Sequence, residues 1–214
     1  MRDFLDSIVA WSGAEEDWRP VPLWTLASWL TFYTLFLLYA FRMHGGFLFI
    51  DFANLVVHEG GHRLFGWFGP TLGLWGGTLL QWLVPLLLAA CFFRQRHTVA
   101  FVFCVFFFFE NWLYTANYMA DARSMNLPLV STSGSDFVEH DWNTIFSSLG
   151  LLQSDTAIAG LVRFLGWAGM LACVSWFACR TRFRNSRQWL PPQSPPQAAK
   201  GCHQNERAVP ARTR

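Results

Sequence analysis

Residues 56–63 read VVHEGGHR, with two histidines four positions apart and a glutamate beside the first. On an α-helix, residues four apart lie on one face, so His58 and His62 can bind one metal ion. Zinc accepts imidazole nitrogen and keeps an open position for water, whose pKa it lowers to about 7. A neighbouring carboxylate can take that proton and pass it to a leaving amine. The HExxH pattern therefore predicts a hydrolytic zinc site with Glu59 as general base.

A site of this kind takes a third protein ligand, and the sequence offers two candidates. Asp121 ends a polar stripe in the apolar segment 98–123, at a depth that we expect to match that of the histidines. His140 lies in the following loop, which can fold back over the site. We expect one of these two residues to bind the metal, and the choice between them stays open here.

Three further polar residues are candidates for supporting the metal ligands or binding substrate. Asn54 lies one helical turn before the first histidine, Asn117 lies one turn before Asp121, and Asp141 directly follows His140. Groups that hydrogen-bond to metal ligands set the orientation of those ligands. We therefore expect Asn54, Asn117 and Asp141 to support the site without binding the metal themselves.

The motif lies in apolar surroundings. The chain has 214 residues, of which 53% are hydrophobic, 18% aromatic and 14% charged, whereas soluble domains carry about 25% charged residues. Its 12 Trp and 22 Phe residues exceed what a core of this length can bury, so lipid is the expected solvent for many of them. The net charge of +2 predicts no nucleic-acid partner.

Five segments are apolar enough and long enough to cross a bilayer, which takes about 20 residues per helix. We therefore predict an all-α, polytopic integral membrane protein with about five transmembrane helices. Polar residues interrupt the second segment, so a re-entrant course remains open for it. The five segments are residues 22–41, 47–68, 72–93, 98–123 and 156–179.

The expected organisation is a single transmembrane domain with polar ends. Residues 1–21 form a polar N-terminal segment, residues 22–179 form the domain, and residues 124–155 form its outer loop. Residues 180–214 carry proline, glutamine and arginine without apolar periodicity. Such composition is typical of a disordered tail.

Arginines indicate the orientation, because Lys and Arg concentrate in cytoplasmic loops. Arg42 follows the first segment, Arg94 and Arg96 follow the third, and four arginines follow the fifth. With five spans these three ends share one side. We therefore expect a cytoplasmic C-terminus and an outer N-terminus, in a bacterial inner membrane.

Glycines next to the motif predict close helix packing. Gly60 and Gly61 remove side chains beside the histidines, and residues 73–81 of the next segment are rich in glycine. Small residues let helices approach closely in membranes. Gln81 in that segment is expected to pack there, with binding of a substrate backbone as the alternative.

These features resemble the site-2 protease superfamily of membrane-embedded zinc metalloproteases. The resemblance rests on HEGGH in an apolar segment, a following Gly-Pro and glycine-rich segment, and a later helix with asparagine and aspartate. It covers residues 47–123. It implies zinc as cofactor, Asp121 as third ligand, and Asn111 or Asn117 as the preceding asparagine. The implied substrates are peptides or transmembrane proteins, cleaved in or near the bilayer.

The function expected from the sequence is therefore that of a zinc-dependent intramembrane endopeptidase in contact with membrane lipid. Two alternatives stay open. A metal transporter or sensor would bind zinc transiently with the same ligands, and it would need polar side chains through the whole depth. Asp51 and Glu110 are the candidates for such a path. A non-catalytic membrane scaffold would carry no zinc.

Overall fold

The structure is a computed structural model, and it describes residues 18–43, 45–128 and 140–188, with side chains described up to residue 180. All regular elements within these ranges are helices, which confirms the all-α class. Four helices are long and apolar enough to cross a membrane. They are α2 (Leu23–Arg42), α4 (Pro70–Arg94), α5 (Thr98–Ala120) and α7 (Asp155–Gln188). The shorter elements are α3 (Asp51–Gly66), α6 (Asp141–Ser148) and the 3-10 helix η1 (Leu152–Ser154).

Local signals explain where several helices begin. Pro22 precedes α2, and Pro70 occupies the first turn of α4, where its missing N–H costs no hydrogen bond. The side chain of His97 accepts a hydrogen bond from the Ala100 N–H and caps α5. His140 caps α6 in the same way by accepting from the Asn143 N–H.

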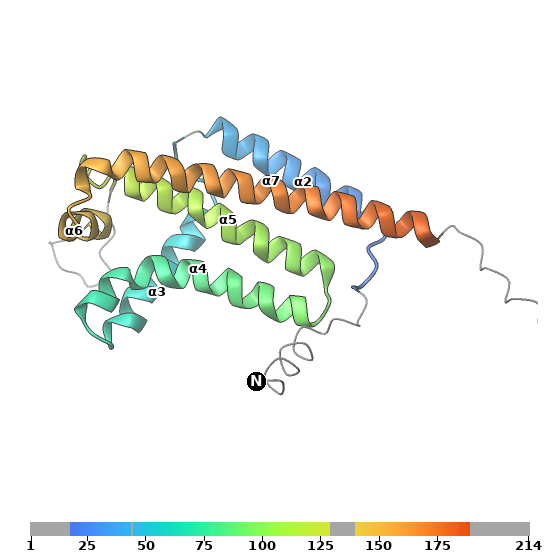
Figure 1. Cartoon of the computed structure of the whole chain (residues 1–214), viewed down its shortest axis with the longest axis horizontal. Helices are drawn as coiled ribbons and strands as arrows, with labels where there is room; N and C mark the ends of the chain where they lie inside the picture. Colours follow the sequence, from blue (N-terminus) through green and yellow to red (C-terminus); the bar gives the residue numbers. More distant parts are fainter. Residues whose placement is uncertain (1–17, 44, 129–139, 189–214) are drawn as a thin grey trace, which may run out of the picture.

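The four long helices lie side by side, and each runs opposite to the long helix before it along the chain (Figure 1). Helix α5 packs between α4 and α7, α2 packs on α7, and α3 packs on α4. The core between α2, α5 and α7 is aromatic and apolar. Its fully buried members are Tyr33, Val102, Phe106, Met170 and Phe177.

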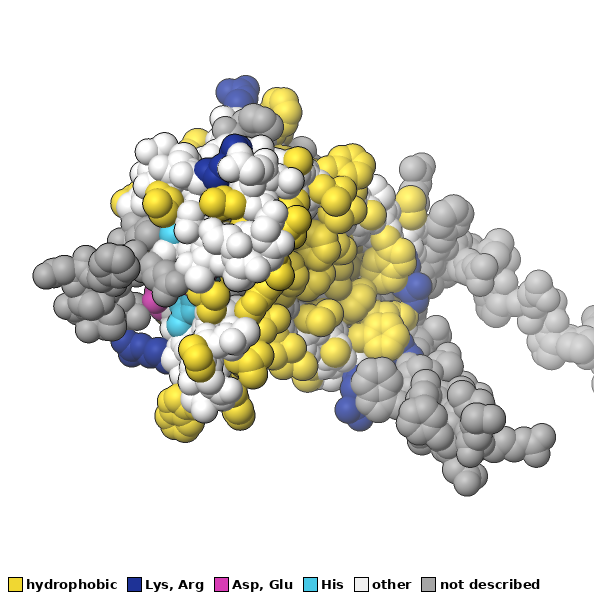
Figure 2. All heavy atoms as spheres, turned by 60° about the vertical axis from the view of Figure 1, so that its left-hand side comes forward, with side chains coloured by type: hydrophobic (Ala, Val, Ile, Leu, Met, Phe, Trp, Pro, Cys, Tyr) yellow, Lys and Arg dark blue, Asp and Glu magenta, His cyan; other side chains and the backbone are white. Residues whose placement is uncertain are grey.

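The outer surface of the bundle is apolar. Leu35 on α2, Leu87 on α4 and Phe164 on α7 are 59–66% exposed. Figure 2 shows hydrophobic side chains over the flank of the bundle, while the end turned forward carries mostly polar groups and backbone. A flank of this kind would be unfavourable in water and is favourable in lipid. The protein is therefore membrane-embedded.

Helix α3 does not form the fifth span. It has 16 residues, a length of about 24 Å, whereas the hydrocarbon core is about 30 Å thick. The chain before it descends along α5, since Gly46 accepts a hydrogen bond from Asn117 and Phe47 contacts Tyr114. Helix α3 then returns from the middle of the bundle to the end where α2 finished (Figure 1). The short α3 is not among the four helices long and apolar enough to cross a membrane, and the re-entrant course left open by the sequence stays a prediction.

This course changes the expected sidedness. The guanidinium groups of Arg96 and Arg180 both lie over the ring of Trp18, 5.5 Å and 5.3 Å from its centroid. Trp18 precedes α2, whereas Arg42 ends α2 at the other end of the bundle (Figure 1). The expectation that Arg42 shares a side with Arg96 and Arg180 is therefore wrong. Residues 18 and 180 lie at the same end of the bundle because an even number of long helices, four, runs between them.

The other expectations on organisation are met only in part. Helix α7 continues to Gln188, so residues 180–188 are helical where the sequence predicted a disordered tail. The predicted outer loop contains α6, and its residues 129–139 lie outside the described residues. Most of the N-terminal segment, 1–17, and the last part of the tail, 189–214, also lie outside them.

Candidate metal centre

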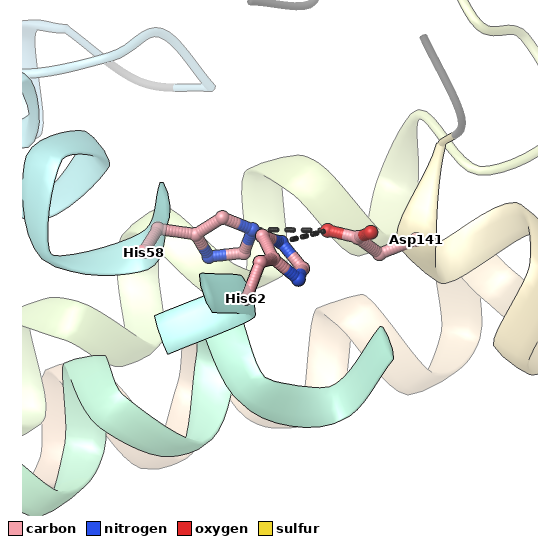
Figure 3. A group of neighbouring side chains, drawn as sticks. All are labelled: His58, His62 and Asp141. Atoms are coloured by element: carbon pink, nitrogen blue, oxygen red, sulfur yellow. Dashed lines mark hydrogen bonds and ion pairs between the residues drawn. The ribbon is translucent and has the colours of Figure 1, made fainter. Parts of the chain in front are cut away.

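Three side chains from two distant parts of the chain meet at one end of the bundle, which we call the site end. His58 and His62 project from α3, and Asp141 projects from the first turn of α6 (Figure 3). Asp141 Oδ2 lies 2.9 Å from His58 Nε2 and 3.1 Å from His62 Nε2. The ligand atoms that these residues offer all lie within 4.8 Å of one another. These three residues could therefore hold one metal ion.

Both histidines direct the same nitrogen, Nε2, toward the carboxylate. Their other nitrogens face α4: His58 Nδ1 lies 2.8 Å from Gln81 Oε1, and His62 Nδ1 lies 2.8 Å from the Gly73 carbonyl oxygen. An acceptor at Nδ1 keeps the imidazole proton there and leaves Nε2 free to bind a metal. The surroundings on α4 therefore fit two metal-binding imidazoles.

The separations also fit a small divalent cation. Zinc binds imidazole nitrogen and carboxylate oxygen at about 2.0–2.2 Å, so ligand atoms in a tetrahedral site lie about 3.3 Å apart. The observed 2.9 Å and 3.1 Å separations need only a small outward movement of Asp141. Two imidazoles and one carboxylate also form the donor set of known catalytic zinc sites.

Burial limits the access of water to the centre. His58 is only 3% exposed, whereas the side chains of His62 and Asp141 are 24% and 11% exposed. A ligand can therefore approach from the His62 side, and Figure 2 shows histidine and acidic side chains reaching the surface at this end.

The surroundings of Asp141 favour its ionised form. Burial by itself would raise the pKa of Asp141, but the neighbouring imidazole groups of His58 and His62 outweigh that effect and lower the pKa to about 2. The hydroxyl of Tyr118 on α5 also lies 3.4 Å from Asp141 Oδ2 and 3.3 Å from the Asp141 backbone nitrogen. At neutral pH the Asp141 carboxylate thus carries a negative charge that can attract a cation.

Asp121, the first of the two expected third ligands, does not join the histidines. It ends α5, and its carboxylate accepts hydrogen bonds from Ser124 Oγ and from the backbone N–H groups of Asn126 and Leu127. Burial would raise the pKa of Asp121, but these bonds outweigh it and lower the pKa. The carboxylate is therefore engaged in closing the turn after α5.

His140, the second expected ligand, is also directed elsewhere. Its Nδ1 caps α6, and its Nε2 lies 3.5 Å from Asp121 Oδ2. The ring of Tyr118 stands between it and the metal centre, 4.4 Å from the His140 ring and 5.7 Å from the His58 ring. The structure thus brings Asp141, expected only to support the site, to the place predicted for Asp121 or His140.

The two asparagines expected near the site have other partners. Asn54 donates to Asp51 Oδ1 and to Glu110 Oε2, both at 3.1 Å, and joins α3 to α5 in the middle of the bundle. Asn117 donates to the Gly46 carbonyl and accepts from Arg163. Both asparagines thus fix α3 and the segment before it against α5, and neither contacts the three residues of the candidate centre.

Glu59 lies next to the centre on the half-buried side of α3. It is not one of the three converging residues, but it is close enough for its charge to act on His62.

Close packing of two helices supports the whole arrangement. A Cβ atom on Gly61 would collide with the backbone of Gly76 and Gly77, and one on Gly77 would collide with the His58 ring. Gly61 therefore has the close-packing role expected for it. Gly60 differs, because its added Cβ would meet only Leu80 Cδ2 at 3.9 Å.

Sequence reasoning missed two parts of this centre. The Gly73 carbonyl is a backbone group, so no side chain in the sequence indicates its role. The position of Tyr118 between His58 and His140 depends on how α6 folds back onto α5. The spacing of Tyr118 from Tyr114, four residues along α5, places both rings near His58 and is the one signal that was available.

Comparison of the chain with protein families, curated proteins and solved structures found no match in any of the three.

Proposed function

We propose that this chain is a zinc-dependent membrane peptidase whose centre is formed by His58, His62 and Asp141. The observation that carries the proposal is the convergence of two imidazole Nε2 atoms on one carboxylate oxygen, with both Nδ1 atoms engaged by α4. Three protein ligands and an open side are typical of catalytic zinc, whereas structural sites are closed by a fourth ligand.

Zinc held here would polarise a peptide carbonyl and favour the loss of a proton from water. Glu59 accepts that proton and delivers it to the leaving amine nitrogen. His58 and His62 would hold the metal through Nε2, and Asp141 would supply negative charge that offsets part of the cation's charge. Each residue thus has one role, and only Glu59 exchanges a proton.

The position of the centre supports a substrate class. The partly exposed His62 and the short helix α6 lie at the site end, beyond the apolar flank. A peptide segment near the membrane surface can reach such a site, and the proposed substrates are therefore peptide bonds close to the ends of transmembrane segments.

The packing disfavours the transporter alternative. The buried polar residues Asp51, Asn54 and Glu110 bond to one another in the middle of the bundle. Between this cluster and the opposite end lie the apolar core residues Val102, Phe106 and Phe177. Conduction of an ion needs polar groups along its whole path, so the described core offers no such route.

Replacing Glu59 tests the proposal. Glu59→Gln keeps the size of the side chain but removes the proton acceptor. We expect the purified variant to retain about one zinc per chain and to lose cleavage of a transmembrane reporter peptide by roughly 10²–10⁴-fold. Zinc content is measured by elemental analysis beside the cleavage rate.

The matched control is the double variant His58→Ala, His62→Ala, which should lose both zinc and activity. Parent-like cleavage by Glu59→Gln would exclude the peptidase mechanism. A parent protein that binds no zinc when zinc is supplied would instead favour the scaffold alternative.

A further inference from the structure

We propose that Gln81 is a positioning residue of the metal centre, which holds His58 in the tautomer that presents Nε2 to the metal. Gln81 Oε1 lies 2.8 Å from His58 Nδ1, and the two residues are 2% and 3% exposed. Gln81 belongs to α4 and His58 to α3, so the contact joins the two helices beside the centre.

The tautomer decides whether this imidazole can bind a metal. A neutral histidine carries its proton on one nitrogen, and only the other nitrogen can act as a ligand. At a site as buried as that of His58, water is not at hand to accept the Nδ1 proton. The acceptor must therefore come from the protein, and Gln81 Oε1 is the acceptor that faces Nδ1.

Gln81 differs from the corresponding partner of His62. His62 is oriented by the Gly73 carbonyl oxygen, which any residue at position 73 would also supply. His58 is oriented by a side-chain atom, so its orientation depends on the identity of residue 81. This makes the positioning of His58 accessible to a mutation that leaves the backbone unchanged.

Packing alone does not account for an amide at this position. Gln81 Nε2 is buried and has no hydrogen-bond partner among the described residues. A buried unsatisfied polar group is destabilising, whereas leucine would fill a similar volume without that cost. The bond from His58 is the interaction that an apolar side chain could not replace.

Three variants of the full-length protein test the inference, which rests on the proposed metal centre. Gln81→Leu removes the acceptor, Gln81→Glu keeps an acceptor at the same distance, and Thr78→Val changes a buried polar residue one turn earlier on α4. Zinc affinity is measured by chelator competition, and the ligand field is measured by the visible absorption of the cobalt-substituted protein.

We expect Gln81→Leu to lower zinc affinity by about 10–100-fold and to alter the cobalt spectrum. Gln81→Glu should restore the affinity to that of the parent or above, and Thr78→Val should match the parent. Thermal unfolding of each apoprotein checks that the fold is retained.

Parent-like zinc affinity in Gln81→Leu, or an equal loss in Gln81→Leu and Gln81→Glu, would overturn the inference. The proposed centre is tested separately by His58→Ala. If His58→Ala binds zinc as tightly as the parent, the centre itself is misassigned, whatever the Gln81 variants do.

Discussion

At the scale of single residues, the choice of the carboxylate decides the chemistry. Asp121 and Asp141 are both buried and both accept several hydrogen bonds, but their donors differ. Asp121 is engaged by backbone amides of its own turn, whereas Asp141 Oδ2 faces two imidazole nitrogens. Only Asp141 therefore lies beside other groups that can bind a metal ion, because backbone N–H groups such as those around Asp121 cannot.

This difference predicts separate effects of three substitutions. Asp141→Asn should lose zinc sharply, because a site with three protein ligands falls to two strong ones. Asp121→Asn and His140→Ala should lower zinc affinity by no more than about 10–100-fold, since neither side chain contacts His58 or His62. Zinc titration of the three purified variants measures the effect. Retention of zinc by Asp141→Asn together with its loss in Asp121→Asn would restore the ligand expected from the sequence.

At the scale of the elements, α3 and α4 act as one unit. Helix α3 supplies both histidines, and α4 supplies the acceptors that orient them. Their backbones approach so closely that Gly61 and Gly76 leave no room for a side chain between them. Small residues at helix contacts in membranes allow this kind of packing. The geometry of the centre therefore depends on the spacing of the two helices.

The two neighbouring glycines of the motif offer a matched test of this dependence. Gly61→Ala places a methyl group against the α4 backbone and should destabilise the protein by about 1–3 kcal/mol while weakening zinc binding. Gly60→Ala adds the same methyl group beside Leu80 only. It should be neutral or slightly stabilising, because alanine favours helix more than glycine. Thermal unfolding and zinc content compare the two, and equal effects would contradict the packing argument.

At the scale of the whole molecule, the two ends of the bundle differ in charge. The end where α2 begins carries Arg19, Arg94, Arg96 and Arg180, and none of the described acidic residues lies there. The site end carries Asp121, Asp141 and Asp155 near α6. Positively charged loops favour the cytoplasm, so the metal centre is expected at the outer face.

This topology predicts the sidedness of both chain ends. A reporter that is active only in the cytoplasm should work when fused either before residue 1 or after residue 214. The same reporter inserted between Trp67 and Phe68, which are 91% and 70% exposed at the turn after α3, should be inactive. Activity after residue 214 without activity before residue 1 would support five spans instead of four.

The sequence by itself determined the helical class, four of the spans, the two histidines and the adjacent glutamate. These depend on local properties: mean hydropathy along one segment, and the fact that residues four apart share a helix face. The same local reasoning found the glycines that let α3 approach α4.

Only the tertiary structure decided the third member of the centre and the course of α3. Asp141 lies 83 residues after His58 along the chain. It reaches the histidines because Trp142, Ile145 and Phe146 of α6 pack on Tyr118 and Met119 at the end of α5. Helix α3 begins in the middle of the bundle, where Asn54 in its first turn donates hydrogen bonds to the carboxyl groups of Asp51 and Glu110. Such contacts join residues whose separation in sequence carries no periodicity, and for that reason no spacing rule could select Asp141 over Asp121.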